Sequence, residues 1–115
     1  MIKFTILLKR KSTITHQEFV TYHQDKHAPL FSSLAAVRQH VKRYVQQHAI
    51  PVKIPGLPPV KYDGITEIWF NSTEDINAVF NDPEYLKKIR PDEELFLDIQ
   101  GCDFVVSKEN IVTKD

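Results

Sequence analysis

The amino-acid sequence predicts an α+β fold of the ferredoxin-like kind, with the element order β-α-β-β-α-β. Four segments alternate apolar and polar residues with the period of a β-strand, and two segments with helix-capping signals separate them. The chain has 115 residues, which is the length of one domain, and it contains no repeat or low-complexity segment. We therefore assign residues 1–115 to a single domain.

The first part of the chain predicts a strand and then a helix. Residues 2–10 place four apolar side chains on one face of the strand, with mostly polar side chains on the other. Thr15 and Glu18 have the spacing of a capping box, in which the side chain of each residue bonds the backbone N–H of the other. A helix should follow and extend to about Lys26.

The end of this helix, residues 22–30, holds two histidines. His23 and His27 are four positions apart, so their imidazoles are neighbours on one face of the helix. Pro29 disfavours helical geometry in the residue before it. We therefore expect the helix to break near His27 or Ala28.

The remaining elements are predicted from alternation, capping and proline positions. They are a helical piece at 31–36, strands at 40–49, 62–70 and 101–108, a helix capped by Ser72, and helical turns at 84–90 and 92–98. Residues 51–59 contain four prolines and one glycine, which predicts a loop. Loops of this kind often form lids or dimer-wrapping segments.

The composition excludes several classes of protein. Lys plus Arg and Asp plus Glu both number 15, so no nucleic-acid or anionic-membrane partner is expected. No apolar run approaches the roughly 20 residues that span a bilayer, and the amino terminus enters a strand pattern without a signal-peptide core. The single cysteine, Cys102, has no intrachain partner and is expected to be a buried, inert thiol. These features predict a cytoplasmic protein.

The third predicted strand indicates that a second copy of the chain covers the sheet. Helices cover only one face of such a sheet, yet residues 62–70 carry large apolar side chains on both faces. A face that mixes Trp69 and Ile65 with carboxylates is best explained as partly buried around a polar pocket. We expect two copies to pack sheet against sheet as a homodimer; the alternative is a monomer with a few exposed apolar side chains.

Several short motifs, taken in order, resemble the EthD family. They are Leu8-Lys9-Arg10-Lys11, Glu18-Phe19 with Tyr22, His27-Ala28-Pro29-Leu30, Tyr62-Asp63-Gly64, Glu67-Ile68-Trp69-Phe70, Asp82-Pro83-Glu84-Tyr85, Asp92-Glu93 and Phe96. The resemblance implies a ferredoxin-like protomer, a homodimer that forms an α/β barrel, and a cleft between helices and sheet. It also implies that His27 lies at the cleft, and that relatives act on polyketide-like, aromatic or lactone compounds.

The sequence departs from the family pattern at one position. The residue after Tyr22 is typically tryptophan in the EthD family, and here it is His23. A histidine makes the pocket more polar, so the substrate can differ from those of better-known relatives.

The candidate catalytic residues are His27, His23 and Glu67. An unperturbed imidazole titrates at about pH 6.5, so His27 is a candidate general acid or base, with His23 assisting. Alternatively, His27 stabilises the helix end before the proline. Glu67 lies in an apolar strand, where desolvation raises a carboxyl pKa and suits it to proton transfer. Alternatively, Glu67 pairs with Arg43 or Lys42 of the neighbouring strand.

A second set of residues is expected to bind the substrate or to line its pocket. These residues are Tyr22, Tyr44, Tyr62, Asp63, Trp69 and Phe104. Tyrosine hydroxyls can donate hydrogen bonds to a ligand carbonyl, and Trp69 and Phe104 supply apolar surface, either as pocket wall or as core. The other histidines, His16, His40 and His48, are expected at the surface.

The sequence predicts neither a metal site nor a bound cofactor. Two helix-borne histidines without a clear third ligand are a weak metal signal, and no glycine-rich nucleotide loop is present. We therefore expect a cofactor-independent enzyme that transfers protons on a small hydrophobic oxygenated molecule, by isomerisation, dehydration or decarboxylation, in a degradation or secondary-metabolism pathway. The alternatives are a non-catalytic protein that sequesters a hydrophobic metabolite, and a haem-dependent or cofactor-free monooxygenase.

Overall fold

The computed structural model describes residues 1–113, and its elements follow the predicted order. The strands of these residues are β1 (Ile2–Leu8), β2 (Val41–His48), β3 (Gly64–Phe70) and β4 (Asp103–Lys108). The α-helices are α1 (His16–Tyr22), α2 (Ala28–Ser32), α3 (Ala35–His40), α4 (Thr73–Phe80) and α5 (Arg90–Phe96). Two π turns, His23–His27 and Tyr85–Ile89, and a 3₁₀ turn, Ile99–Gly101, extend the helical segments.

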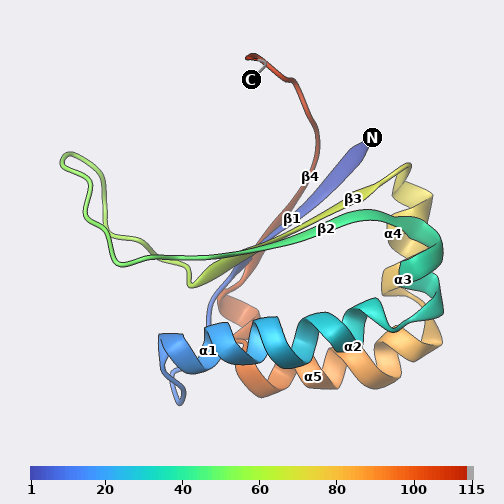
Figure 1. Cartoon of the computed structure of the whole chain (residues 1–115), viewed down its shortest axis with the longest axis horizontal. Coiled ribbons are helices and arrows are strands. Elements are labelled where there is room, and N and C mark those ends of the chain that lie inside the picture. Colours follow the sequence, from blue (N-terminus) through green and yellow to red (C-terminus); the bar gives the residue numbers. More distant parts are fainter. Residues whose placement is uncertain (114–115) are drawn as a thin grey trace.

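The strands form one antiparallel sheet in the order β2-β3-β1-β4, and the helices lie on one face of it (Figure 1). This arrangement confirms the predicted α+β, ferredoxin-like fold. β3 distinguishes the two faces, because its residues alternate between buried and half-buried. Thr66 and Ile68 are buried toward the helices, whereas Glu67 and Trp69 lie on the opposite face.

The predicted helix starts are confirmed in detail. The Thr15 hydroxyl accepts a hydrogen bond from the Glu18 backbone N–H at 3.1 Å, and Glu18 Oε1 accepts one from the Thr15 N–H at 2.8 Å. Ser72 caps α4 by accepting from the Asp75 N–H at 3.3 Å. These caps satisfy backbone donors that have no partner within the first helical turn.

The expected helix break near His27 is wrong. The chain remains helical from α1 through the π turn His23–His27 into α2, which ends at Ser32. The backbone N–H of Ala28 bonds the His23 carbonyl, five residues back, where an α-helix would use the carbonyl four residues back. This wider turn lies directly before Pro29, which has no N–H and crowds the preceding turn. The π turn therefore carries the helix past the proline.

A register shift decides which side chains of β2 face the helices. The pairing of β2 with β3 shifts register between Val41 and Arg43. Val41 consequently packs against the core on the helical face, while Val45 pairs with Glu67 on the other face. Tyr44 and the two alternate residues after it now face the helices.

The connection between β2 and β3 is an arm that projects from the body of the protein (Figure 1). Its base is closed by a hydrogen bond from the Ala49 N–H to the Asp63 carbonyl at 2.9 Å. Apolar side chains along it are 51–71% exposed: Ile50, Val52, Ile54, Leu57 and Val60. In residues 1–113, no helix has both the length and the apolar composition to cross a membrane.

Candidate functional site

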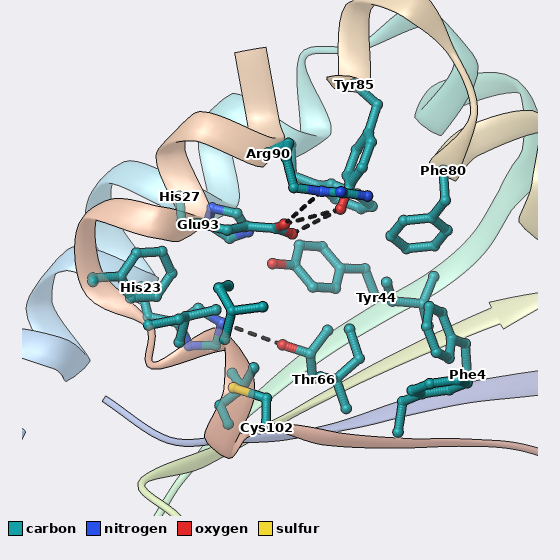
Figure 2. A pocket seen from close by; sticks show the side chains of 18 of the residues that line it. Phe4, His23, His27, Tyr44, Thr66, Phe80, Tyr85, Arg90, Glu93 and Cys102 are labelled. Carbon is teal, nitrogen blue, oxygen red and sulfur yellow. Dashed lines mark hydrogen bonds and ion pairs between the residues drawn. The ribbon is translucent and has the colours of Figure 1, made fainter. Parts of the chain in front are cut away.

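A cavity of about 460 Å³ lies between the helices and the sheet (Figure 2). Much of its wall is apolar and aromatic, including Phe4, Phe31, Ile68, Phe80, Phe96 and Phe104. Most of its polar side chains come from three regions, which are the π turn His23–His27, the strands β2 and β3, and the helical segment from Tyr85 to Glu93; Cys102 and Asp103, at the start of β4, add to them. An apolar pocket with a few convergent polar groups is typical of small-molecule sites.

His27 is held by a carboxylate from α5. Its Nδ1 lies 2.8 Å from Oδ2 of Asp92, and both side chains are nearly enclosed. The Tyr22 hydroxyl donates to the other oxygen of Asp92. Because the carboxylate accepts both bonds, the proton of neutral His27 resides on Nδ1, and the ring orientation is fixed.

The second ring nitrogen of His27, Nε2, is free to take part in proton transfer. Within the described residues, Nε2 has no hydrogen-bond partner, and every fully buried side-chain nitrogen or oxygen there has one. Nε2 therefore remains accessible, and the ring lines the cavity. Burial lowers the pKa of His27, and the Asp92 bond opposes this by favouring the protonated form. The arrangement suits a neutral imidazole that can accept a proton at Nε2.

Glu93 places a second proton-transfer group in the same cavity. Burial raises the pKa of this carboxyl to about 7, although hydrogen bonds from Tyr85 and the charge of Arg90 act in the opposite direction. The Tyr85 hydroxyl lies 2.9 and 3.1 Å from the two carboxyl oxygens, and Arg90 Nε lies 3.7 Å from one of them. Figure 2 shows this group at the roof of the cavity. Near neutral pH, Glu93 can therefore hold a proton or release it.

Tyr44 adds a neutral hydrogen-bond donor. Its hydroxyl accepts from Gln46 Nε2 at 2.9 Å, and its ring lies below Glu93 in Figure 2. Burial raises the pKa of Tyr44 to about 12, so the phenol keeps its proton. A phenol of this kind can donate to a ligand oxygen.

His23 is almost completely buried and uses both ring nitrogens. Nε2 lies 3.2 Å from Thr66 Oγ1, and Nδ1 lies 3.0 Å from Nε2 of His48. The ring stacks on Phe19 with a centroid separation of 5.3 Å. Burial, together with the neighbouring histidines, lowers the pKa of His23 to about 3, so this imidazole is neutral.

The structure brings together only part of the predicted site. His27, His23, Tyr44 and Phe104 line the cavity, and Tyr22 supports it through Asp92. Phe104 does so from the edge of the sheet and is 71% exposed.

Glu67 and Trp69 are not brought to His27. Side chains of a strand alternate between faces, so the neighbours of Thr66 and Ile68 necessarily point away from the helices. Glu67 bonds Lys3 Nζ at 2.6 Å and accepts from Gln47, not from the predicted Arg43 or Lys42.

Tyr62 and Asp63 also lie away from the cavity. The Tyr62 hydroxyl donates to Asp103. Asp63 accepts from the Arg10 backbone N–H at 3.0 Å, and it lies 2.8 Å from Nδ1 of His16. These contacts join the end of β1, the start of α1 and the base of the arm.

Sequence reasoning missed the acidic partners and one histidine. Asp92 and Glu93 were noted only as a family motif, although adjacent carboxylates that follow a proline at a helix start are a recognisable signal. His48 was expected at the surface, and it is half-buried, because the register shift in β2 turns one side of its ring toward His23. Tyr85 and Arg90 carried no signal of their own.

Cys102 lines the cavity and is half-buried, as a free thiol. It donates to the Asp98 carbonyl at 3.2 Å, and burial raises the pKa of the thiol. A raised pKa disfavours the thiolate, so Cys102 is a poor nucleophile. In residues 1–113, no group of three or more histidine, cysteine or acidic side chains is arranged to hold a metal ion.

The fold and the cavity define a class: a ferredoxin-like α+β protein with a cleft between its helices and its sheet. Residues 11–100 match the EthD domain, so the chain belongs to the EthD family. No curated protein matches the sequence.

Solved structures share this fold at low sequence identity. An EthD family protein from Bacillus halodurans is 16% identical, with a TM-score of 0.71 over 96% of this chain and 99% of its own. A dimeric protein of unknown function with a ferredoxin-like fold, from Bacteroides fragilis, is 12% identical, with a TM-score of 0.66 over 94% and 95%. A putative antibiotic biosynthesis monooxygenase from Nitrosomonas europaea is 11% identical, with a TM-score of 0.61 over 95% and 98%.

Proposed function

We propose that this protein is a cofactor-independent acid–base enzyme that acts on a small, mostly apolar, oxygenated molecule. The observation that carries the proposal is the Asp92–His27 pair, whose free imidazole nitrogen borders an apolar cavity that also contains Glu93. The substrate class is an aromatic, lactone or polyketide-like compound with an acidic C–H bond, and the reaction is an isomerisation, dehydration or decarboxylation.

In an isomerisation or a dehydration, the proposed reaction begins with proton removal by His27, whereas in a decarboxylation loss of CO₂ forms the enolate and the protonated ring would return a proton to carbon. Nε2 takes a proton from a carbon next to a carbonyl group, and the imidazolium that forms is stabilised by the Asp92 carboxylate. The negative charge develops on the carbonyl oxygen, where Tyr44 and protonated Glu93 are the available donors. In a dehydration, Glu93 gives its proton to the departing hydroxyl, so one proton is taken up and one is released.

Proton removal can be tested before the natural substrate is known. Enolisable aromatic ketones and lactones are incubated with the protein in D₂O, and deuterium incorporation at carbon is followed by NMR. We expect His27→Asn to slow incorporation by about 10²- to 10⁴-fold, the usual contribution of a general base. Asparagine is preferred to alanine because its amide can still donate to the buried Asp92.

Matched variants control for the loss of a histidine or an acid. His40→Asn removes a comparable pair, since His40 Nδ1 lies 2.7 Å from Asp75 outside the cavity, and it should leave incorporation unchanged. Glu93→Gln should slow incorporation, whereas Glu94→Gln, at the exposed neighbouring position, should not. If His27→Asn and His40→Asn behave like the wild type, His27 is not the base and the proposal fails.

A non-catalytic binding protein is the second candidate function, which the aromatic wall of the cavity supports. Saturable binding of the same probes, without deuterium incorporation or product, would favour it. A monooxygenase, as named for the neighbour from Nitrosomonas europaea, would instead consume oxygen with the probe, which an oxygen electrode detects.

A further inference from the structure

A continuous hydrogen-bonded path runs from the cavity to the outer surface at the base of the arm. It starts at Thr66, whose side chain lines the cavity and whose hydroxyl lies 3.2 Å from Nε2 of His23 (Figure 2). It continues from Nδ1 of His23 to Nε2 of His48, 3.0 Å away. The two rings meet nearly at right angles, with centroids 5.2 Å apart.

The outer end of this path is accessible. Nδ1 of His48 has no hydrogen-bond partner within residues 1–113, and no fully buried side-chain nitrogen or oxygen there lacks one. His48 also lines a surface hollow with Ala49, Ile50 and Val52, at the point where the arm leaves the sheet. Solvent can therefore reach Nδ1 of His48, while His23 is only 1% exposed.

We propose that Thr66, His23 and His48 form a proton relay that connects the cavity with solvent. Each of the three groups can both donate and accept a proton, and each uses a different atom on its two sides. The role of the relay in turnover rests on the proposed acid–base function, but the relay itself can be measured without a substrate.

The relay has two consistent hydrogen-bond directions. In the first, Thr66 donates to His23 and His23 donates to His48. In the second, His48 donates to His23 and His23 donates to Thr66, whose proton then points into the cavity. In both arrangements, the Thr66 hydroxyl and both ring nitrogens of His23 have a hydrogen-bond partner.

One proton moves from solvent to the cavity when the second hydrogen-bond arrangement of the relay converts to the first. A proton from water binds Nδ1 of His48, and Nε2 of His48 passes its proton to Nδ1 of His23. His23 then passes its Nε2 proton to Thr66, which releases its own hydroxyl proton to a group in the cavity. Each imidazole forms one N–H bond and breaks one, so no net charge remains on the path.

The packing around His23 keeps the path intact. Phe19 stacks on one side of the ring with an interplanar angle of 25°, and Phe96 lies 5.8 Å away, centroid to centroid. The Gln46 side chain bonds the His23 carbonyl at 2.8 Å. Burial lowers the pKa of both His23 and His48, so neither ring traps the proton as a stable cation.

The relay would supply protons to the cavity while an apolar ligand fills it. The ligand would displace water from the inner groups, and protons could then no longer be exchanged through the cavity. The path through His48 reaches the surface at the end of β2 and does not pass through the cavity, so a ligand in the cavity does not block it. It can therefore return the acid and base groups to their starting protonation states between turnovers.

The relay predicts fast exchange of a buried proton. The ring N–H of His23 is measured by NMR in ¹⁵N-labelled, ligand-free protein, and its exchange rate with water is compared with that of His48→Gln. Glutamine can keep one hydrogen bond to His23, but unlike an imidazole it cannot take up a proton on one nitrogen and release one from another. We expect the substitution to slow His23 N–H exchange about tenfold or more, because exchange would then require local opening.

Two controls separate a relay from a loosened structure. Backbone amides of β3 should exchange equally in both proteins, and His40→Gln should leave the His23 rate unchanged. Equal His23 rates in the wild type and His48→Gln would overturn the relay. If His48→Gln does not fold, the wild type alone decides: a His23 N–H that exchanges no faster than neighbouring backbone amides also overturns it.

Failure of the relay and failure of the enzyme are distinguishable. Fast His23 exchange without deuterium transfer to any probe would retain the relay and contradict the proposed function. Deuterium transfer that depends on His27, combined with equal His23 exchange in both proteins, would retain the function and remove the relay.

Discussion

The role of each histidine depends on which of its ring nitrogens is already bonded. His27 uses Nδ1 for Asp92 and keeps Nε2 accessible, whereas His23 uses both nitrogens inside the protein. His48 uses only its inner nitrogen. Three imidazoles within one region can therefore act as a base, a buried link and a solvent contact, although their chemistry is the same in isolation.

His23 should make the protein sensitive to acid. Unfolded His23 takes up a proton near its ordinary pKa of 6.5, whereas folded His23 stays neutral until the pH approaches about 3. Acid therefore favours the unfolded state in the window between these values. From pH 7 to pH 5 this single group should lower the free energy of unfolding by about 2 kcal/mol.

Urea unfolding of the wild type and His23→Gln, at pH 7 and pH 5, measures this contribution. Glutamine does not titrate, so the variant should lose about 2 kcal/mol less than the wild type between the two pH values. The comparison uses the difference between pH values, which removes the cost of the substitution itself. An identical pH dependence in both proteins would show that His23 has the same pKa in the folded and unfolded states, which would contradict its burial as a neutral ring.

At the scale of elements, the two helical segments that line the cavity both continue past a proline by means of a π turn. Each contains a π turn that ends two residues before a proline, at Pro29 and at Pro91. In each turn the N–H that follows bonds a carbonyl five residues back, from Ala28 to His23 and from Arg90 to Tyr85. Both π turns contribute side chains to the cavity, which agrees with the frequent occurrence of such turns at functional sites.

Gly64 sets the distance between α1 and the sheet. A Cβ atom at this position would lie 2.8 Å from the Gln47 carbonyl oxygen and 3.1 Å from the Phe19 ring. The carbonyl belongs to the backbone of β2 and cannot rotate away. Gly64→Ala should therefore lower the free energy of unfolding by about 1–3 kcal/mol, as overpacked core substitutions do.

Urea denaturation measures the effect of Gly64→Ala directly. Because Phe19 stacks on His23, the displacement should also change the ring resonances of His23 in NMR spectra. Unchanged stability together with unchanged His23 resonances would contradict this account of the glycine.

At the scale of the whole molecule, the face of the sheet opposite the helices is suited to burial. Its charges are paired locally: Lys3 bonds Glu67 at 2.6 Å, and Arg43 lies over the Trp69 ring at 4.9 Å from its centroid. Val105 on the same face is 53% exposed. Two structural neighbours, from Bacteroides fragilis and Thermobifida fusca, are named as dimeric proteins. We propose a homodimer in which two such faces pack together as an α/β barrel.

Sedimentation tests the proposed dimer. The wild type should sediment at twice the chain mass, and Val105→Asp should shift it toward the monomer, because an unpaired carboxylate is costly to bury. Val112→Asp, in the exposed tail, is the matched control and should leave the mass unchanged. A wild-type monomer, or a Val105→Asp protein that remains dimeric, would contradict packing through this face.

The sequence by itself determined the order of the strands and helical segments and the starts of the two capped helices, α1 and α4. Strand alternation and helix caps depend on residues only a few positions apart, so β3 and the Thr15 capping box could be predicted directly. The two facing histidines of the π turn also followed from local spacing. His27 at the cavity was implied by family resemblance and not by any local rule.

Tertiary structure alone decided which groups meet. Asp92 reaches His27 across 65 residues of sequence, and a register shift in β2 turns His48 inward. Glu67 was expected at the site because its strand is otherwise apolar, yet the alternation of side chains along β3 places it on the opposite face of the sheet, where it bonds Lys3. The hydrogen-bond partners and protonation states of these groups depend on burial and on contacts between distant segments. Local sequence periodicity does not predict either of these.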